Sequence, residues 1–366
     1  MKYEPLVDRG RLLESVRAAY GLAAEELTFV PEGYVAACYA VQCTRNERYF
    51  LKLWPNTVVG SEGAARLAAS LALVRALYER RLLTNVPYPL PTREGALSAT
   101  FAGSPFAVFP FLPGRVAPHW PGLTQTVRDE FARVLAAIHR ATPALADVLP
   151  RREIFDVSFE GDLLADLTAV AALESHERPA LIELAELIVP RRPEILTQLD
   201  RLHRLQDVVR RLDGPLVLCH TDMGGENLLI DDRNRLFVLD WDDATVAPPE
   251  HDLQSGLQSS LGEGFESFLR VYLASGGNGH LSLDHFAFYL LRRNLGDMAV
   301  RFHRLLTEAT TDLEATDLLH GMDAWGFAQW RVLDQRLEAV AAALDNTSTI
   351  GAAGGPEWSG ASAAGS

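Results

Sequence analysis

The sequence predicts an α+β fold with two lobes, in which a small β-rich N-terminal lobe precedes a large helical C-terminal lobe. At 366 residues, the chain exceeds the size at which a single hydrophobic core usually stops growing. Residues that favour strands dominate three short runs near the N-terminus, at 27–30, 34–44 and 48–54. Apolar residues recur at helical spacing in the segments that follow residue 114, at 124–140, 160–212 and 263–344.

The N-terminal lobe is expected to contain an antiparallel pair of strands and one long helix. The polar turn Arg45–Glu47 joins the second and third strands, and a bend at Glu32 and Gly33 precedes them. The segment 61–83 then carries apolar residues at helical spacing and ends near Pro87. Together these elements predict a sheet that is followed by a single helix.

Changes in composition along the chain indicate four parts. The segment 109–114 contains two prolines and a glycine, and proline fixes φ and removes a backbone donor, so we expect a stiff crossover there. A plain exit from a strand into a loop is an equally good explanation of this local sequence. The tail consists largely of Gly, Ala and Ser, which can bury little apolar surface. We therefore expect an N-terminal lobe at 1–108, a hinge at 109–114, a helical lobe at 115–346 and a disordered tail at 347–366.

The composition is that of an acidic protein. A net charge of −14 and a pI near 5.2 argue against nucleic acid as a partner, because phosphates require a basic surface. No apolar stretch reaches the ~18 residues needed to span a bilayer, and Met1–Glu4 does not begin a signal peptide, so we expect a cytoplasmic protein without membrane contacts. The cysteines lack metal-binding spacing and are expected to be buried free thiols: Cys38, Cys43 and Cys219.

The segment 220–242 carries the densest chemical signal. His220, Asp222 and Asn227 come just before a short apolar run, and Asp240 follows a second run after a polar turn. Two short strands joined in this way can bring the two carboxylates and the amide to one point. Asp, Asn and Gly are also common in simple turns, which is the structural alternative for this motif.

The spacing H-x-D-x-x-x-x-N matches the catalytic loop of protein kinases, and Asp240 stands where a metal-binding aspartate is expected. The chain resembles the aminoglycoside phosphotransferase family, whose members are small-molecule kinases with the protein-kinase fold. The string D-W-D…A-P…E-x-D-L after residue 239 is most similar to the spectinomycin phosphotransferases. The sequence departs from the family at Gly224 and Glu226, where a His and a Gly are often found.

The resemblance implies a role for each residue of the motif. Asp222 would orient and deprotonate the acceptor hydroxyl, whereas Asn227 and Asp240 would hold Mg²⁺ against the nucleotide, ATP or GTP. His220 and Asp252 would support the catalytic loop. A Lys between large apolar residues, Lys52, would bind the nucleotide phosphates; an outward-facing Lys is the structural alternative.

Four further residues of the N-terminal lobe and hinge are implied in nucleotide binding. Gly33 would lie over the phosphates, although the full glycine-rich pattern is absent and a plain turn is the stronger local explanation. Glu62 is the candidate partner of Lys52, but it could equally be a helix-terminal acid. The main chain around Phe109 and Phe111 would meet the adenine.

The acceptor is expected to be a small cationic aminocyclitol or aminoglycoside, such as spectinomycin, so that the enzyme would confer antibiotic resistance. The acids Asp242, Asp243 and Glu250 are the candidate contacts for its ammonium groups, with a metal or structural role as the alternative. A kinase of the same fold that acts on a nucleoside antibiotic, choline, homoserine or a sugar is a second possibility, and a non-catalytic pseudokinase is a third. The sequence leaves the oligomeric state open.

Overall fold

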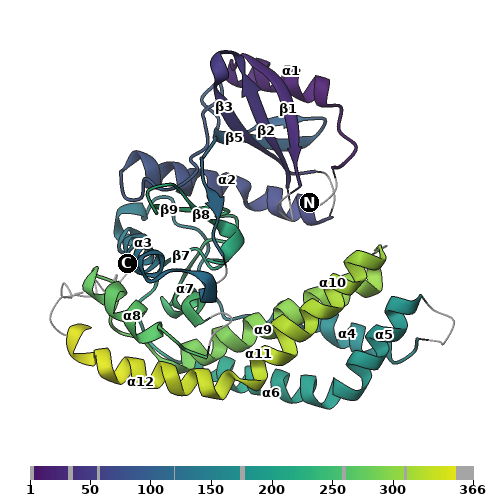
Figure 1. The fold of residues 1–366 in the computed structure, drawn as a ribbon, viewed down its shortest axis with the longest axis vertical. Helices are drawn as coiled ribbons and strands as arrows, with labels where there is room; N and C mark the ends of the chain where they lie inside the picture. The colour runs from purple at the N-terminus through teal and green to yellow at the C-terminus, as the bar shows by residue number, and fades with distance from the viewer. Residues whose placement is uncertain are drawn as a thin grey trace, which may run out of the picture. The chain divides into compact units, whose positions relative to one another are not determined.

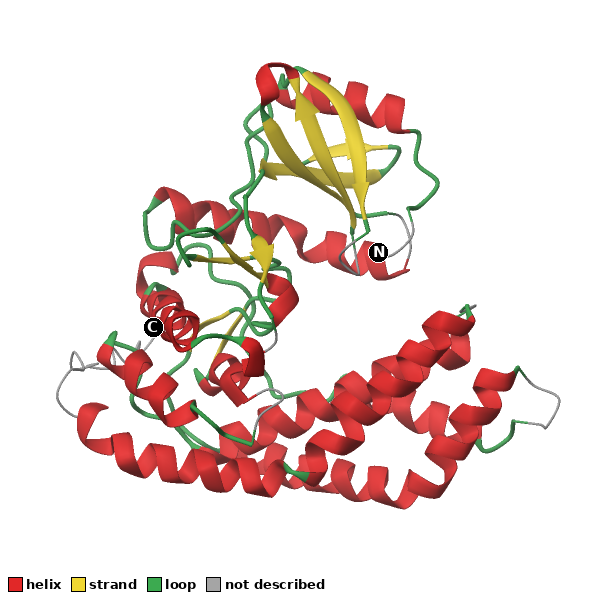
Figure 2. Cartoon of the chain, in the orientation of Figure 1, coloured by secondary structure: helices red, strands yellow, loops and turns green. Residues whose placement is uncertain are grey.

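A computed structural model of the chain confirms the predicted fold class, with a small antiparallel sheet near the N-terminus and a helical C-terminal region (Figures 1 and 2). The chain forms two compact units, unit 1 from Met1–Arg152 and Val217–Val246, and unit 2 from Glu153–Leu216 and Ala247–Ser366. The structure describes residues 4–31, 36–55, 58–118, 120–173, 178–257, 261–308 and 311–351.

Unit 1 contains a five-stranded antiparallel sheet in the order β1-β2-β3-β5-β4, drawn in yellow in Figure 2. The second and third strands form the predicted antiparallel pair. Their register places Lys52 opposite Cys38 on one side and Ala107 on the other. The strands of the sheet are β1 (Ala24–Val30), β2 (Ala37–Cys43), β3 (Arg48–Leu53), β4 (Ala99–Phe101) and β5 (Ser104–Pro110).

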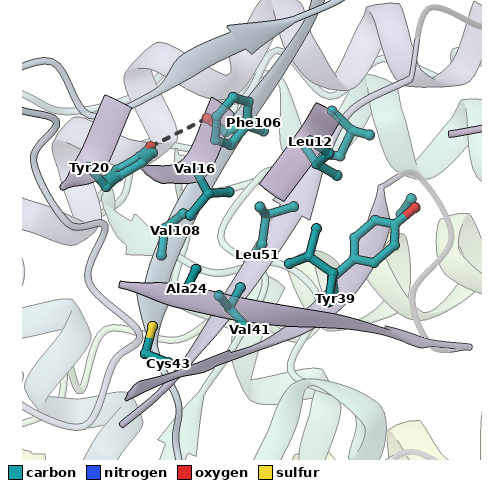
Figure 3. Close-up of a cluster of buried hydrophobic side chains, with 13 residues drawn as sticks. Leu12, Val16, Tyr20, Ala24, Tyr39, Val41, Cys43, Leu51, Phe106 and Val108 are labelled. Carbon is teal, nitrogen blue, oxygen red and sulfur yellow. Dashed lines mark hydrogen bonds between the residues drawn. The ribbon is translucent and has the colours of Figure 1, made fainter. Parts of the chain in front are cut away.

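One face of this sheet packs against α1 (Arg9–Tyr20), a helix that the sequence analysis did not predict (Figure 3). Leu12 and Val16 are fully buried, and the Tyr20 hydroxyl donates to the Phe106 carbonyl at 3.5 Å. The helix begins at an Asp8 N-cap, whose side chain accepts the Arg11 amide, and it ends before Gly21 at φ +70°. Glycine suits this left-handed position because it has no Cβ.

The opposite face of the sheet packs against α2 (Val58–Glu79), the predicted long helix. Leu67 and Leu71 of α2 join a small cluster with Trp54, Ala107 and Phe109. Because side chains alternate along a strand, Lys52 lies on the same face of β3 as Phe50, which packs against this cluster.

The rest of unit 1 contains the predicted hairpin of the catalytic motif. The hairpin consists of β8 and β9, which form a three-stranded sheet with β6 in the order β6-β8-β9. A separate two-stranded sheet is formed by β7 and β10. Thr124 accepts the Val127 amide and caps the predicted helix α3, whose apolar side chains are buried. These elements are β6 (Arg115–Val116), α3 (Gln125–Arg140), β7 (Val217–Cys219), β8 (Leu228–Ile230), β9 (Leu236–Val238) and β10 (Thr245–Ala247).

Unit 2 is built from helices that pack around α9. Its long apolar face buries Phe286, Phe288, Tyr289 and Phe302. None of the helices within the described ranges is long and apolar enough to cross a membrane. The helices of unit 2 are α4 (Glu160–Val170), α5 (Pro179–Ile188), α6 (Arg192–Val209), α7 (Glu250–Leu253), α8 (Phe265–Ala274), α9 (Leu283–Thr307), α10 (Asp312–Met322), α11 (Ala328–Arg331) and α12 (Leu333–Gly351).

The C-terminal helix α12 is longer than the sequence predicted. It continues to Gly351, whereas the expected disordered tail begins at residue 347. Thr347 is 2% exposed, and its hydroxyl donates to the Ala343 carbonyl at 2.7 Å. The hydroxyl therefore has a hydrogen-bond partner within the helix. The prediction from the Gly, Ala and Ser composition therefore placed the end of the helix at least one turn too early. The remaining tail residues, 352–366, lie outside the described part of the chain.

A buried ion pair lies in unit 2. Arg292 donates to both carboxylate oxygens of Glu153, at 3.2 and 2.8 Å, and also approaches His251 Nε2 at 2.9 Å. Burial and the nearby Arg292 cation lower the pKa of His251 to about 4, so this imidazole is neutral at neutral pH. The Nε2 atom of the neutral ring can then accept a hydrogen bond from the Arg292 guanidinium. This network joins the start of unit 2 to the middle of α9.

Candidate active site

The loop after β7 is organised by His220. Its Nε2 donates to the Leu239 carbonyl at 2.7 Å, and its Nδ1 accepts the Asp222 amide at 3.3 Å. These two bonds require a neutral ring with its proton on Nε2. The imidazole is fully buried and packs edge-on against Trp241, with ring centroids 4.9 Å apart. His220 thus ties the backbone of the loop to the end of β9.

Asp222 and Asn227 face each other across this loop. The Asn227 Nδ2 donates to the Asp222 Oδ2 at 2.8 Å and to the Asp222 carbonyl at 2.9 Å. A short 3₁₀ turn at Gly225–Asn227 brings the amide into this position, directly before β8. Asn227 therefore orients the Asp222 carboxylate with its nitrogen and keeps its amide oxygen for another ligand.

Asp240 lies beside Asn227 because β8 and β9 pair. Leu228 is opposite Val238 in the register, and the Leu239 amide donates to the Asn227 carbonyl at 2.8 Å. Asp240 follows immediately, with φ +59°. This left-handed conformation turns the chain sharply at the end of the hairpin.

Lys52 forms an ion pair with Asp240. Its Nζ lies 2.7 Å from the Asp240 Oδ1, and the two side chains are 20% and 39% exposed. Burial alone would lower the pKa of Lys52, but the carboxylates of Asp240 and Asp242 outweigh it and raise the pKa above its ordinary value. The ammonium in turn lowers the pKa of Asp240. Both groups are therefore charged at neutral pH.

Helix α2 contacts the two acids that follow. The Ser70 hydroxyl donates to the Asp242 Oδ1 at 3.1 Å, and the Arg66 guanidinium donates to the Asp243 Oδ1 at 2.7 Å. Burial raises the pKa of Asp242, and neighbouring carboxylates raise it further, whereas the Lys52 cation and the Ser70 hydroxyl oppose this shift. Neither Ser70 nor Arg66 was singled out from the sequence. The available signal was a polar pair at i and i+4 in a largely apolar helix.

The expected glutamate partner of Lys52 is not found among the described side chains of α2. The single acid among them is Glu79, and it pairs with Arg75 at 2.6 Å. Glu62 lies within α2, but the structure does not describe its side chain. Gly33 lies outside the described residues. The partner that the structure assigns to Lys52 is Asp240.

The predicted hinge, 109–114, overlaps the last two residues of β5, which ends at Pro110. Phe109 is buried in the cluster between the sheet and α2. Phe111 is covered by the Arg48 guanidinium, whose carbon lies 3.7 Å from the ring centroid, and its amide donates to the Arg48 carbonyl at 3.4 Å. Packing therefore fixes the side chains of both aromatic residues.

Two predicted residues lie in α7 of unit 2. Glu250 is 1% exposed and accepts the Ser282 amide at 2.5 Å, with His285 Nδ1 at 3.7 Å. A carboxylate enclosed in this way stabilises the start of α9, so its burial speaks against the expected contact between Glu250 and an acceptor. Asp252 is fully buried on the same helix.

The donors of unit 1 fit a hard cation. Asp240 offers a carboxylate and Asn227 an amide oxygen on neighbouring strand ends, and Mg²⁺ prefers a few such oxygens together with water and phosphate. The Lys52 ammonium already shows that this point attracts a cation. In the segment Asp240–Asp243, called the acidic segment below, three carboxylates face the two cations Lys52 and Arg66.

Three solved structures share the fold of this chain. Spectinomycin phosphotransferase APH(9)-Ia, bound to ADP and spectinomycin, has a TM-score of 0.72 at 17% identity, covering 92% of this chain and 99% of its own. An aminoglycoside phosphotransferase from Alicyclobacillus acidocaldarius has 0.61 at 16%, covering 94% and 98%. The amicoumacin kinase hAmiN has 0.59 at 15%, covering 90% and 94%.

The chain also matches a family model across most of its length. Residues 26–289 match the model of the phosphotransferase enzyme family, and this range includes Lys52, the catalytic motif and the acidic segment. The resemblance noted in the sequence is thereby confirmed at the level of the family. The protein belongs to the phosphotransferase enzyme family and is a kinase that phosphorylates a hydroxyl group of a small molecule.

Proposed function

We propose that this enzyme transfers the γ-phosphoryl group of ATP or GTP to a hydroxyl of a small cationic aminocyclitol or aminoglycoside, of the spectinomycin type, and so confers resistance. The observation that carries the chemistry is the grouping of Lys52, Asp240, Asn227 and Asp222 within unit 1. These residues supply a cation for phosphates, two oxygen donors for a metal and a carboxylate for the acceptor.

Asp222 is proposed as the group that receives the acceptor proton. The hydroxyl oxygen forms a bond to the γ-phosphorus while the bond to the β-phosphate oxygen breaks, and the proton passes to the carboxylate late in the reaction. Asn227 holds Asp222 Oδ2, which limits the rotation of the carboxylate and keeps it aligned. Such positioning provides much of the catalysis in phosphoryl transfer.

Lys52 and Asp240 are proposed to exchange partners when nucleotide binds. Lys52 would turn from Asp240 to the nucleotide phosphates, and Asp240 and Asn227 would hold Mg²⁺. When bound, the cation neutralises charge on the phosphate oxygens. The ion pair of Lys52 with Asp240 places both groups where this exchange needs only a small movement of the side chains.

The acceptor class is proposed from charge and from similarity. The chain carries a net charge of −14, and Asp243, 55% exposed, presents a carboxylate beside the catalytic loop. Asp242 is more enclosed and already accepts from Ser70. The acidic segment suits an ammonium-bearing ligand, and the likeness to a spectinomycin phosphotransferase supports the same class.

A kinase of the same fold with another acceptor is the main alternative. The likeness to an amicoumacin kinase illustrates how the fold serves different small molecules. A nucleoside antibiotic, choline, homoserine or a sugar would use the same catalytic residues. A non-catalytic pseudokinase is disfavoured because Lys52, Asp222, Asn227 and Asp240 are all present.

The test is a nucleotide-consumption screen with product mass measured. The acceptors are spectinomycin, aminoglycosides, nucleoside antibiotics and choline, each with ATP or GTP and MgCl₂. A product heavier by one phosphoryl group with spectinomycin or an aminoglycoside supports the proposal. Turnover with a neutral acceptor alone would reject the cationic class and keep the kinase chemistry.

A further inference from the structure

The contact between α2 and the acidic segment has no role in the mechanism above. Arg66 and Ser70 are four residues apart, so they lie on one face of α2. Leu67 and Leu71, one residue further along, form the adjacent stripe that packs against the sheet. Helix α2 thus contacts the sheet that carries Lys52 with one stripe and the acidic segment with the other.

Ser70 is well placed to hold Asp242. Ser70 is 8% exposed, and its hydroxyl donates to the Asp242 Oδ1 at 3.1 Å. Arg66 makes a second contact from the same helix, to Asp243. Thr221 adds a third restraint from the catalytic loop, because its hydroxyl donates to the Asp243 carbonyl at 3.2 Å.

Asp240 needs such support when its partner changes. It has a left-handed backbone conformation, and its carboxylate accepts a hydrogen bond from Lys52. On the proposed function, Lys52 turns to the nucleotide phosphates and this restraint is lost. Asp242, two residues later, keeps its bond to Ser70 and so maintains the direction of the acidic segment.

We propose that Ser70, acting through Asp242 and assisted by Arg66, is a positioning residue that holds Asp240 in place for Mg²⁺. In this arrangement α2 is linked to the proposed metal-binding aspartate through the acidic segment. The inference rests on the proposed function, because it assigns Asp240 to the metal.

The test measures equilibrium binding of the ATP analogue AMP-PNP to the full chain, with MgCl₂ and with EDTA. The ratio of the two affinities gives the Mg²⁺ enhancement without any acceptor or turnover. Ser70→Ala should reduce this enhancement about tenfold, the size expected for one hydrogen bond to a charged group, while the affinity in EDTA stays unchanged. Ser70→Thr, which keeps a hydroxyl, should retain most of the enhancement.

Two controls separate positioning from general damage. Ser15→Ala removes a hydroxyl from α1 that bonds within its own helix, and Arg75→Gln removes an arginine–carboxylate pair from α2. Both should behave like wild type, whereas Arg66→Gln should lower the enhancement. In an Asp242→Ala background, Ser70→Ala should have no further effect, because the two residues act through one bond.

Three results would overturn the inference. Ser70→Ala could leave the Mg²⁺ enhancement unchanged, it could weaken binding equally with MgCl₂ and with EDTA, or its effect could persist undiminished in the Asp242→Ala background. A wild-type chain that binds AMP-PNP without any Mg²⁺ enhancement would instead remove Asp240 from the metal site. That outcome would reject the proposed function itself and is visible before any variant is made.

Discussion

The Lys52 ammonium and the Asp240 carboxylate lie 2.7 Å apart, although 188 positions separate them in the chain. The pair joins β3 of the five-stranded sheet to the end of the catalytic hairpin. Each group neutralises the charge of the other, so neither is an unpaired charge in this part of the protein. With nucleotide and Mg²⁺ bound, Lys52 would face the phosphates and Asp240 would face the cation. Each group would then again lie beside an opposite charge.

Asp240→Ala should abolish the Mg²⁺ dependence of nucleotide affinity. The variant removes a proposed metal ligand and leaves Lys52 free to meet the phosphates directly, so nucleotide should still bind in EDTA. Calorimetric titration with and without MgCl₂ measures both effects. Asp147→Ala, which removes an exposed aspartate paired with Arg80, is the matched control. An equal response of wild type and Asp240→Ala to Mg²⁺ would dismiss the assignment.

Asp222→Asn should lower kcat by roughly 10²–10⁴-fold, the usual contribution of a general base. Asparagine keeps the shape of the side chain and can still interact with Asn227, but it cannot take the acceptor proton. Nucleotide affinity should survive, because Asp222 does not belong to the proposed phosphate and metal sites. Steady-state turnover and nucleotide titration on the same preparation provide the check. Turnover near the wild-type rate would remove Asp222 from the mechanism.

Local sequence patterns predicted the elements of the site but not the contacts between distant elements. The spacing of His220, Asp222 and Asn227 is set within one loop, so it can be read from the sequence. The partner of Lys52 depends on how a strand and a hairpin far apart in the chain pack together. Helix α1 was missed because only Leu12, Val16 and Tyr20 form its apolar stripe, although Asp8 and Gly21 flank it with suitable capping residues.

The links from α2 were missed for a different reason. The family resemblance implies an acid on this helix, whereas in the described contacts of α2 with the acidic segment the acids lie on the other side, at Asp242 and Asp243. A hydroxyl and a guanidinium on the helix make the contacts. Burial also changes what a motif residue can do: Glu250 has the acidic side chain expected for a cationic acceptor, but its 1% exposure gives it a packing role.

Arg292→Met should destabilise the protein by about 3–5 kcal/mol, because it leaves the Glu153 carboxylate buried without its cation. The free energy of unfolding from urea denaturation measures this loss. Arg270→Met removes an exposed arginine–glutamate pair on α8 and should change stability by less than about 0.5 kcal/mol. The double variant Glu153→Gln with Arg292→Met should recover part of the loss. A cost for Arg292→Met no larger than that for Arg270→Met would mean that the buried pair is not stabilising.

The stability of unit 2 should fall as the pH drops from about 6.5 to about 4. The pKa of His251 is about 4 in the folded chain and near 6.5 when unfolded, so the unfolded state binds a proton across this window and the folded state does not. The stability is fully present above the unfolded pKa, and about 3 kcal/mol is lost by the lower limit. Unfolding free energies measured at several pH values should show this slope in wild type and in the exposed-site control His280→Gln. His251→Gln should flatten it, and an unchanged slope in that variant would contradict the assignment.

Acceptor affinity should weaken as ionic strength rises. The proposed acceptor carries ammonium groups, and Asp243 is 55% exposed, so their attraction is screened by salt over ~8 Å at physiological ionic strength. Spectinomycin titrations at increasing NaCl, with saturating AMP-PNP and MgCl₂, measure the dependence, and Asp243→Asn should reduce its slope. Asp147→Asn serves as the control, since this exposed aspartate contributes the same charge and likewise pairs with an arginine, Arg80, but lies outside the acidic segment. Affinity that is independent of salt would show that exposed charges do not attract the acceptor. A slope that Asp243→Asn and Asp147→Asn reduce equally would show that the net charge of the protein, and no contact of the acidic segment, governs acceptor binding.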